Sequence, residues 1–201
     1  MFRKKPRLSE RFKEAIQPTP IRRKIVSTLH GLNVQQKQLE RKSYQLQTRD
    51  KDLYSKCVSA LQAKKNELAT MYANECAEIR KMIMTTIKSE LALEQVALRL
   101  ETIKVSGDVA HLMGSVLSVI GGVKTQLESM LPEISAELSD IGESLQSAVL
   151  EMGEATEQSF GMSIPTEEGN KILDEASVLA EQKMKDKFPE MPSIPTREPQ
   201  T

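Results

Sequence analysis

Residues 32–106 read LNVQQKQLERKSYQLQTRDKDLYSKCVSALQAKKNELATMYANECAEIRKMIMTTIKSELALEQVALRLETIKVS and contain neither glycine nor proline. The absence of both residues over so long a stretch favours long helices, because they are the strongest helix breakers. Apolar residues recur every seven positions in and just before the first part of the stretch: Ile25, Leu32, Leu39, Leu46, Leu53 and Ala60. Since a seven-residue repeat lays one narrow apolar stripe along a helix, the pattern predicts a helix that packs against one neighbour.

A second apolar stripe follows in the same stretch. Its members are Leu68, Tyr72, Ile79, Met82, Ile83, Ile87, Leu91 and Leu98. The polar run 62–66 between the stripes predicts a turn, with Asn66 as an N-cap and Glu67 in the next first turn. Antiparallel helices at about 21–62 and 67–105 would cover each other's stripes. The sequence therefore predicts an elongated all-α fold built on a helical hairpin over residues 21–105.

Shorter helices are expected after the hairpin. Residues 106–122 are apolar but glycine-rich, which predicts a weak helix able to bend. The expected hinge glycines are Gly107, Gly114, Gly121 and Gly122. An acidic helix at about 123–150 completes a region 106–150. A linker and a C-terminal helix, starting near Ser163–Glu168, then occupy residues 151–187.

The formal charge of zero hides a division between the two halves of the chain. Residues 1–105 hold 22 basic and 11 acidic residues, whereas residues 106–201 hold 6 basic and 17 acidic residues. A basic half of this kind indicates a surface for an anionic partner. We expect the acidic residues of 123–187 to fold back over the basic hairpin and keep the monomer in solution.

The first 17 residues have the pattern of a basic amphipathic segment. Leu8, Phe12 and Ile16 fall on one helical face with basic residues around them, which predicts an anchor lying in a membrane interface. A basic tail that only raises solubility is the alternative. Neither a secretory signal nor a spanning helix is expected, because no apolar run is long enough. The predicted membrane-binding residues are Phe2, Arg3, Lys4, Lys5, Arg7, Leu8, Arg11, Phe12, Lys13 and Ile16.

The last segment, residues 188–201, is rich in proline. Pro189, Pro192 and Pro195 recur at the three-residue period of polyproline II, and each follows an apolar residue. Phe188, Met191 and Ile194 would therefore share one edge of an extended strand. The pattern predicts a short linear motif that docks into a partner's groove.

Signatures of catalysis are missing from the sequence. His30 and His111 are the two histidines and lie in different predicted elements. Cys57 and Cys76 have neither zinc-site nor disulfide-framework spacing, so we expect inert thiols in a reducing compartment. Aromatic residues make up only 3% of the chain, too few for an ordinary substrate pocket. We expect no enzyme, no cofactor, no metal site and no small-molecule substrate.

This organisation resembles that of the ESCRT-III family and, within it, the archaeal CdvB-type cell-division proteins. The run Ala73–Lys81, continuing to Leu100–Lys104, is similar to the family's second helix, and residues 109–127 resemble its third-helix region. The tail resembles the family's motif for the MIT domain of its AAA ATPase. That resemblance implies contact through Phe188, Pro189, Met191, Pro192, Ile194 and Pro195. No winged-helix segment follows, so the likeness is to a shorter paralogue, and direct recruitment by a CdvA-like protein stays open.

The resemblance implies a membrane-remodelling filament subunit. Such a subunit polymerises with copies and paralogues on anionic membranes in cell division or scission, and a CdvC-like AAA ATPase disassembles it. It would be cytoplasmic and peripheral on the inner face of the cell membrane at the division site. One alternative is a soluble coiled-coil scaffold, with Gln36, Ser43 and Asp50 setting the register of a dimer. A nucleic-acid-associated architectural protein ranks lower, because aromatic stacking groups are few.

Overall fold

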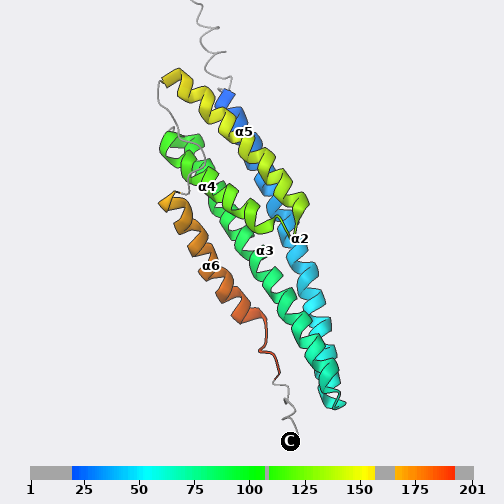
Figure 1. Cartoon of the computed structure of the whole chain (residues 1–201). Helices are drawn as coiled ribbons and strands as arrows, with labels where there is room; N and C mark the ends of the chain where they lie inside the picture. The colour runs from blue at the N-terminus through cyan, green and yellow to red at the C-terminus, as the bar shows by residue number, and fades with distance from the viewer. Residues whose placement is uncertain (1–19, 107–108, 157–165, 193–201) are drawn as a thin grey trace, which may run out of the picture.

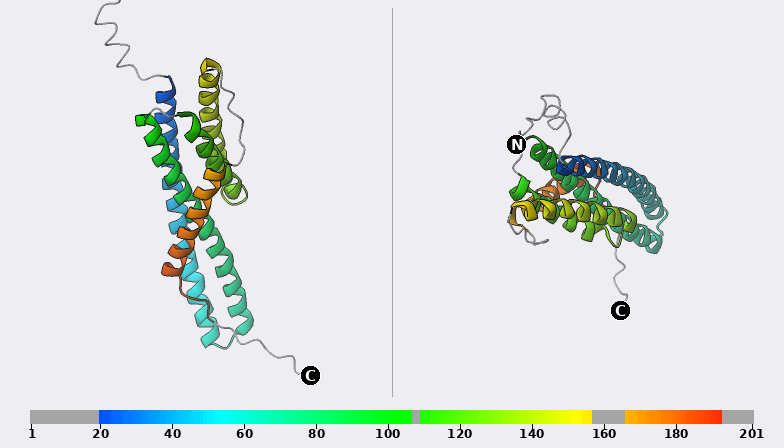
Figure 2. Two further views of the ribbon diagram at one scale, coloured as in Figure 1. Left: turned by 90° about the vertical axis from the view of Figure 1, so that its left-hand side faces the viewer. Right: turned by 90° about the horizontal axis from the view of Figure 1, so that it is seen from above.

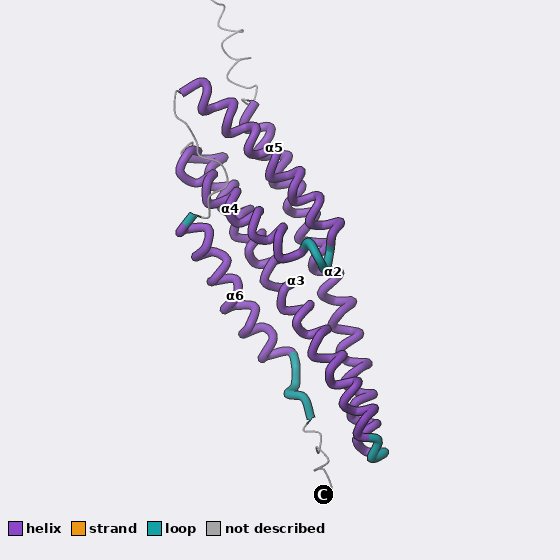
Figure 3. The backbone as a smooth tube through the Cα atoms, in the orientation of Figure 1, coloured by secondary structure: helices purple, strands orange, loops and turns teal. Residues whose placement is uncertain are grey.

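The computed structural model describes residues 20–106, 109–156 and 166–192, and these residues form helices and no strand (Figure 1). The helices are α2 (Pro20–Gln62), α3 (Asn66–Ser106), α4 (Val109–Leu127), α5 (Pro132–Thr156) and α6 (Glu167–Lys187). Short turns separate α2 from α3 and α4 from α5 (Figure 3). The predicted all-α fold with a long hairpin is therefore confirmed, and α2 and α3 begin and end within one residue of the expected positions.

The shorter helices cover one end of the α2–α3 hairpin. Helix α5 packs along α2, α4 packs between α3 and α5, and α6 runs back along α3 and α4 (Figures 1 and 2). The closed end of the hairpin projects beyond α4 and α5 (Figure 1). No described helix is long and apolar enough to cross a bilayer.

The apolar stripe of α2 forms one side of the core. Ile25, Leu32 and Leu39 are buried, and Leu46 and Leu53 are half-buried against the same cluster. The seven-residue repeat is thus confirmed as the buried side of α2, but α2 packs on both α3 and α5, so the expectation of one neighbour was wrong.

Helix α3 departs from the predicted stripe. Leu68 and Leu98 are 37% and 52% exposed, whereas Leu93, Val96 and Leu100 are completely buried. The predicted stripe is confirmed at Ile79, Ile83, Ile87 and Leu91, which are buried, and is wrong at Leu68 and Leu98. Helix α3 contacts α2, α4 and α6, so its buried surface extends around more of the helix than one stripe. A helix in contact with several neighbours cannot keep a narrow apolar face.

The turn between α2 and α3 closes with a left-handed residue. Lys64 has a φ of 56°. Its backbone N–H donates to Leu61 O at 2.9 Å, and the Lys65 N–H donates to Ala60 O at 2.9 Å. These two bonds form a Schellman motif, in which the left-handed position is usually glycine because a side chain is disfavoured there.

We expect Lys64→Gly to raise the free energy of unfolding by about 1 kcal/mol, because glycine relieves the left-handed strain. Chemical denaturation followed by circular dichroism measures the change. Lys65→Gly is the matched control, since Lys65 lacks the positive φ and should gain nothing. Equal effects of the two substitutions would contradict this account of the turn.

The predicted start of the acidic helix, residue 123, is wrong. Helix α4 continues to Leu127, and α5 begins only at Pro132. Proline lacks the N–H that a helix interior needs but fits a first turn, where that donor has no intrahelical acceptor. The N–H groups of Met130 and Leu131 both donate to Leu127 O, at 3.0 and 2.7 Å, which closes the turn between the helices.

Candidate functional site

The close approach of α6 to α4 depends on Gly122, one of the glycines predicted to form a hinge. Helix α4 runs without a break through Gly114, Gly121 and Gly122, while Gly107 lies outside the described residues. A Cβ on Gly122 would lie 2.8 Å from Leu173 Cδ1 of α6, whereas one on Gly121 would meet no atom within 4 Å. Gly122 therefore makes room for α6 in this conformation, and the hinge role stays a prediction.

Polar contacts hold the start of α6. Thr166 caps the helix by accepting a hydrogen bond from the Gly169 N–H at 3.0 Å, and its own N–H donates to Ser118 Oγ of α4 at 3.3 Å. Arg99 Nη1 of α3 lies 2.8 Å from Glu168 Oε1. Carboxylates in a first turn also meet the positive end of the helix dipole. The N-terminal end of α6 is thus tied to both α3 and α4.

The C-terminal half of α6 lies near Glu90 of α3. Burial raises the pKa of the Glu90 carboxyl, and the nearby Glu40 and Glu94 raise it further, while Lys183 and Lys187 lower it. Because both lysines belong to α6, the docked helix places cations beside a carboxylate that the hairpin itself leaves crowded by like charges.

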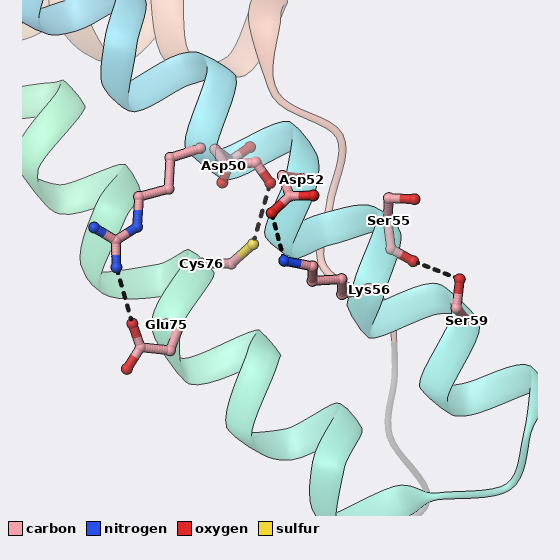
Figure 4. Close-up of polar contacts among 8 residues, drawn as sticks. Asp50, Asp52, Ser55, Lys56, Ser59, Glu75 and Cys76 are labelled. Atoms are coloured by element: carbon pink, nitrogen blue, oxygen red, sulfur yellow. Dashed lines mark hydrogen bonds and ion pairs between the residues drawn. The ribbon is translucent and has the colours of Figure 1, made fainter.

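A buried ion pair joins α2 and α3 between Glu90 and the closed end of the hairpin. Arg80 Nε of α3 lies 2.8 Å from Asp50 Oδ1 of α2, and Arg80 Nη2 lies 3.3 Å from Oδ2. The Asp50 side chain is 3% exposed and that of Arg80 is 15% exposed. Cys76 Sγ also donates to the Asp50 backbone oxygen at 3.6 Å (Figure 4). The two-pronged geometry suits a guanidinium and a carboxylate and aligns α2 with α3.

Arg80 also binds the tail. Its Nη1 donates to Pro189 O at 2.6 Å. The guanidinium carbon lies 5.3 Å from the centroid of the Phe188 ring and 5.8 Å from that of Tyr54 on α2. A cation at such distances from aromatic rings is attracted to both. The first two tail residues are therefore held by one hairpin side chain through a hydrogen bond and a ring contact.

Met191 reaches a small apolar cluster near the closed end of the hairpin. Cys57, Ala60 and Ala69 form its buried part. Half-buried residues around them are Leu61, Tyr72, Ala73 and Met191. Phe188 packs against the main core instead, and its backbone is extended at φ −116° and ψ 124°. Phe188 and Met191, three residues apart, thus both pack on the hairpin, as neighbours on one edge of an extended strand can.

The predicted tail motif is only partly within the described residues. Phe188, Met191 and Pro192 are half-buried and Pro189 is exposed, while Ile194 and Pro195 lie outside the described part of the chain. The sequence did not identify Arg80 or Tyr54 as tail contacts. Asp50 gave a usable signal, because an acidic residue beside the apolar stripe of α2 needs a cationic partner when it is buried.

Both cysteines are free and buried. Burial, followed by the nearby Asp50, raises the pKa of the Cys76 thiol to about 11, and burial raises the pKa of Cys57 as well. Protonated, enclosed thiols are poor nucleophiles. Among the described residues, no group of His, Cys, Asp and Glu side chains is arranged to hold a metal ion.

The predicted membrane-binding residues, Phe2 to Ile16, all lie outside the described residues. The first described helix nevertheless carries an exposed basic face. Lys37, Arg41, Tyr44 and Lys51 are exposed and follow helical spacing, so their side chains share one side of α2. These side chains place positive charge on an exposed part of α2.

The comparisons with known proteins agree with this arrangement. The Snf7 family model matches residues 28–199. The chain is 38% identical over 174 residues to Cell division protein B1 of Sulfolobus acidocaldarius, which covers 87% of this chain and 81% of that protein. It is 32% identical over 168 residues to Cell division protein B of the same organism, covering 84% of this chain and 64% of that longer protein. No solved structure matches the chain.

The fold is a long helical hairpin that is covered by shorter helices and contacted by Phe188, Pro189 and Met191 of its own C-terminal segment. The match to the Snf7 model covers most of the chain and defines the class of this helical protein. The chain belongs to the ESCRT-III (Snf7) family, and its relatives identify it as the CdvB type.

Proposed function

We propose that this chain is the subunit of a filament that polymerises on anionic membranes and remodels them during cell division. Membership of the ESCRT-III family, together with two relatives named as cell division proteins, carries the proposal. Polymerisation would involve copies of this chain and its paralogues. Its place of action would be the inner face of the cell membrane at the division site.

The closed arrangement of the helices supports a regulated subunit. Helices α4, α5 and α6 cover one end of the hairpin. Arg99 pairs with Glu168 at the start of α6, and Arg80 donates to Pro189 O just after its end. A side-by-side polymer of hairpins needs long surfaces that α5 and α6 cover in this conformation. Release of these helices would therefore precede assembly.

The proline-containing tail supports disassembly by an ATPase. Phe188, Pro189, Met191 and Pro192 occupy the described part of the predicted motif, with Ile194 and Pro195 following it. We propose that this motif binds the MIT domain of a CdvC-like AAA ATPase, which then extracts the subunit from the filament. An extended, proline-fixed strand loses little conformational entropy when it enters a groove.

The alternative function, a coiled-coil scaffold, is less well supported. It requires polar side chains at heptad positions that are free to set the register of a dimer. Ser43 and Asp50 are buried inside the monomer, where Asp50 pairs with Arg80 of the same chain. These two positions therefore align the hairpin of one molecule and leave the filament subunit as the better supported function.

Deletion of residues 1–17 should lower binding to anionic vesicles more than tenfold, because each basic residue near an anionic surface contributes about 1 kcal/mol. Co-sedimentation of the full chain and the deletion with phosphatidylglycerol-containing vesicles measures the change. Pure phosphatidylcholine vesicles are the control for charge. A triple change of Leu8, Phe12 and Ile16 to serine keeps every charge and tests apolar insertion separately. Equal pelleting of the full chain and the deletion would contradict membrane binding by this segment.

A further inference from the structure

The last turns of α6 reverse the distribution of charge that the sequence predicts. The sequence predicts acidic segments that fold over a basic hairpin. At this end of α6, however, Lys183 and Lys187 line a cleft of about 610 Å³ together with Glu40 of α2 and Glu90 of α3. The helix thus brings positive charge to an acidic part of the hairpin.

Glu90 lies among charged groups from all three helices around it. It also lines a second cleft, of about 290 Å³, between α2 and α3. Burial raises the pKa of the Glu90 carboxyl most, the nearby carboxylates of α2 and α3 raise it further, and the two α6 lysines lower it. The other charged residues that line the two clefts are Lys37, Glu40, Arg41, Glu94, Lys183 and Lys187.

The cleft lets water reach Glu90 from the side of α6. Its volume of about 610 Å³ is room for several water molecules, each of which takes up about 30 Å³ in the liquid. Docking of α6 therefore removes little of the hydration of this carboxylate, and the hairpin accounts for most of its burial. The main effect of docking on Glu90 is attraction by Lys183 and Lys187, which requires an ionised carboxylate.

We propose that Glu90 is an ionisation-dependent latch for the C-terminal half of α6. Its carboxylate attracts Lys183 and Lys187 and so holds this half of the helix, whereas protonation of Glu90 or loss of the two lysine charges releases it. Arg99 still pairs with Glu168 at the start of α6, so the helix opens from its C-terminal end. The latch adds a control by charge that is independent of membrane binding and of the ATPase.

The sign of the pH dependence follows from the two states of α6. The lysines of the docked helix lower the pKa of Glu90 relative to the open hairpin. Docking is therefore favoured above the pKa of the open form and is weakened as the pH falls through the pKa of the docked form. Because burial and the nearby carboxylates keep this pKa above its ordinary value of 4.5, the loss begins at a higher pH than for an exposed glutamate.

The first test measures amide hydrogen exchange of residues 178–187 in the full chain at neutral pH. The variants are Glu90→Gln, Lys183→Gln with Lys187→Gln, and all three changes together. We expect exchange about threefold faster in the first two variants, as for a charge interaction that remains in contact with water. The triple variant should exchange no faster than the double lysine variant, because the lysines and Glu90 act through one interaction.

Lys185→Gln is the matched control. Lys185 is an exposed lysine of the same helix, but it lines neither cleft, so its loss should leave the exchange of residues 178–187 unchanged. Residues 167–174 are an internal control, because the Arg99–Glu168 pair holds them in every variant. Their exchange should change less than that of residues 178–187.

A second test varies the pH. Protection factors, which correct for the effect of pH on exchange itself, are compared as the pH falls from 7 towards about 4, the range in which carboxylates titrate. The unchanged chain should lose about threefold more protection in residues 178–187 than Glu90→Gln does. The other carboxylates titrate in both proteins, so the difference reports Glu90.

The outcomes divide as follows. Slower exchange in Glu90→Gln at neutral pH would overturn the latch, because burial of the carboxylate would then oppose docking more than the lysines favour it. Additive effects of the lysine and Glu90 changes, an equal effect of Lys185→Gln, or the same pH dependence in Glu90→Gln would also overturn it. Faster exchange that is not additive, with Lys185→Gln unchanged, supports the latch whether or not the chain binds membranes.

Discussion

Asp50→Ala should lower the free energy of unfolding by about 3–5 kcal/mol, the usual cost of leaving one member of a buried ion pair without its partner. The substitution strands the Arg80 guanidinium, which is only 15% exposed and loses both of its contacts with the Asp50 carboxylate. The contact with Pro189 O remains but supplies no negative charge. Urea denaturation followed by circular dichroism measures the loss.

Asp52→Ala is the matched control for burial. Asp52 pairs with Lys56 at 2.7 Å, slightly closer than Asp50 and Arg80, but these side chains are 61% and 51% exposed (Figure 4). Exposed pairs contribute little because water screens them, so this variant should lose far less stability than Asp50→Ala. Comparable losses at the two positions would contradict the importance of burial. Combining Asp50→Leu with Arg80→Met should recover most of the stability, since apolar side chains replace both charges.

The hairpin could be predicted because its causes are local. A seven-residue apolar repeat and a stretch without glycine or proline determine where α2 and α3 lie, and the polar run at 62–66 marks the turn between them. Exposure along α3 could not be predicted in the same way. Leu98 and Leu100 are both apolar, but only the contacts of α3 with α4 and α6 decide that Leu100 is buried.

The tail site shows a similar division. The three-residue spacing of Phe188 and Met191 follows from the prolines and is visible in the sequence. The hairpin residue that holds them, Arg80, is not visible in the sequence. It lies 109 residues before Pro189, and only the path of α6 along α3 brings the two together. Charge alone could not single out Arg80 among the basic residues of the hairpin. The buried carboxylate of Asp50 distinguishes it.

Gly169→Ala should release α6 from α4 and promote assembly. A Cβ at this position would lie 2.7 Å from Ser118 Oγ, 2.9 Å from Ser118 Cβ and 2.9 Å from the capping Thr166 Oγ1. Overpacking of this kind costs about 1–3 kcal/mol, offset by up to about 1 kcal/mol from the higher helix propensity of alanine. A net loss near 1.4 kcal/mol raises the undocked population about tenfold. Hydrogen exchange in α6 measures release, and sedimentation with anionic vesicles measures assembly.

Gly121→Ala is the matched control on α4 and should act in the opposite direction. Its Cβ would meet no atom within 4 Å, so only helix propensity changes, and the free energy of unfolding should rise by about 0.5–1 kcal/mol. If α4 must bend at Gly121 during opening, this variant should also assemble less readily than the unchanged chain. Faster exchange in Gly169→Ala without more assembly would show that α6 docking does not restrain the polymer. Comparing the two variants therefore shows whether the packing of α6 on α4 or the stiffness of the α4 backbone restrains assembly.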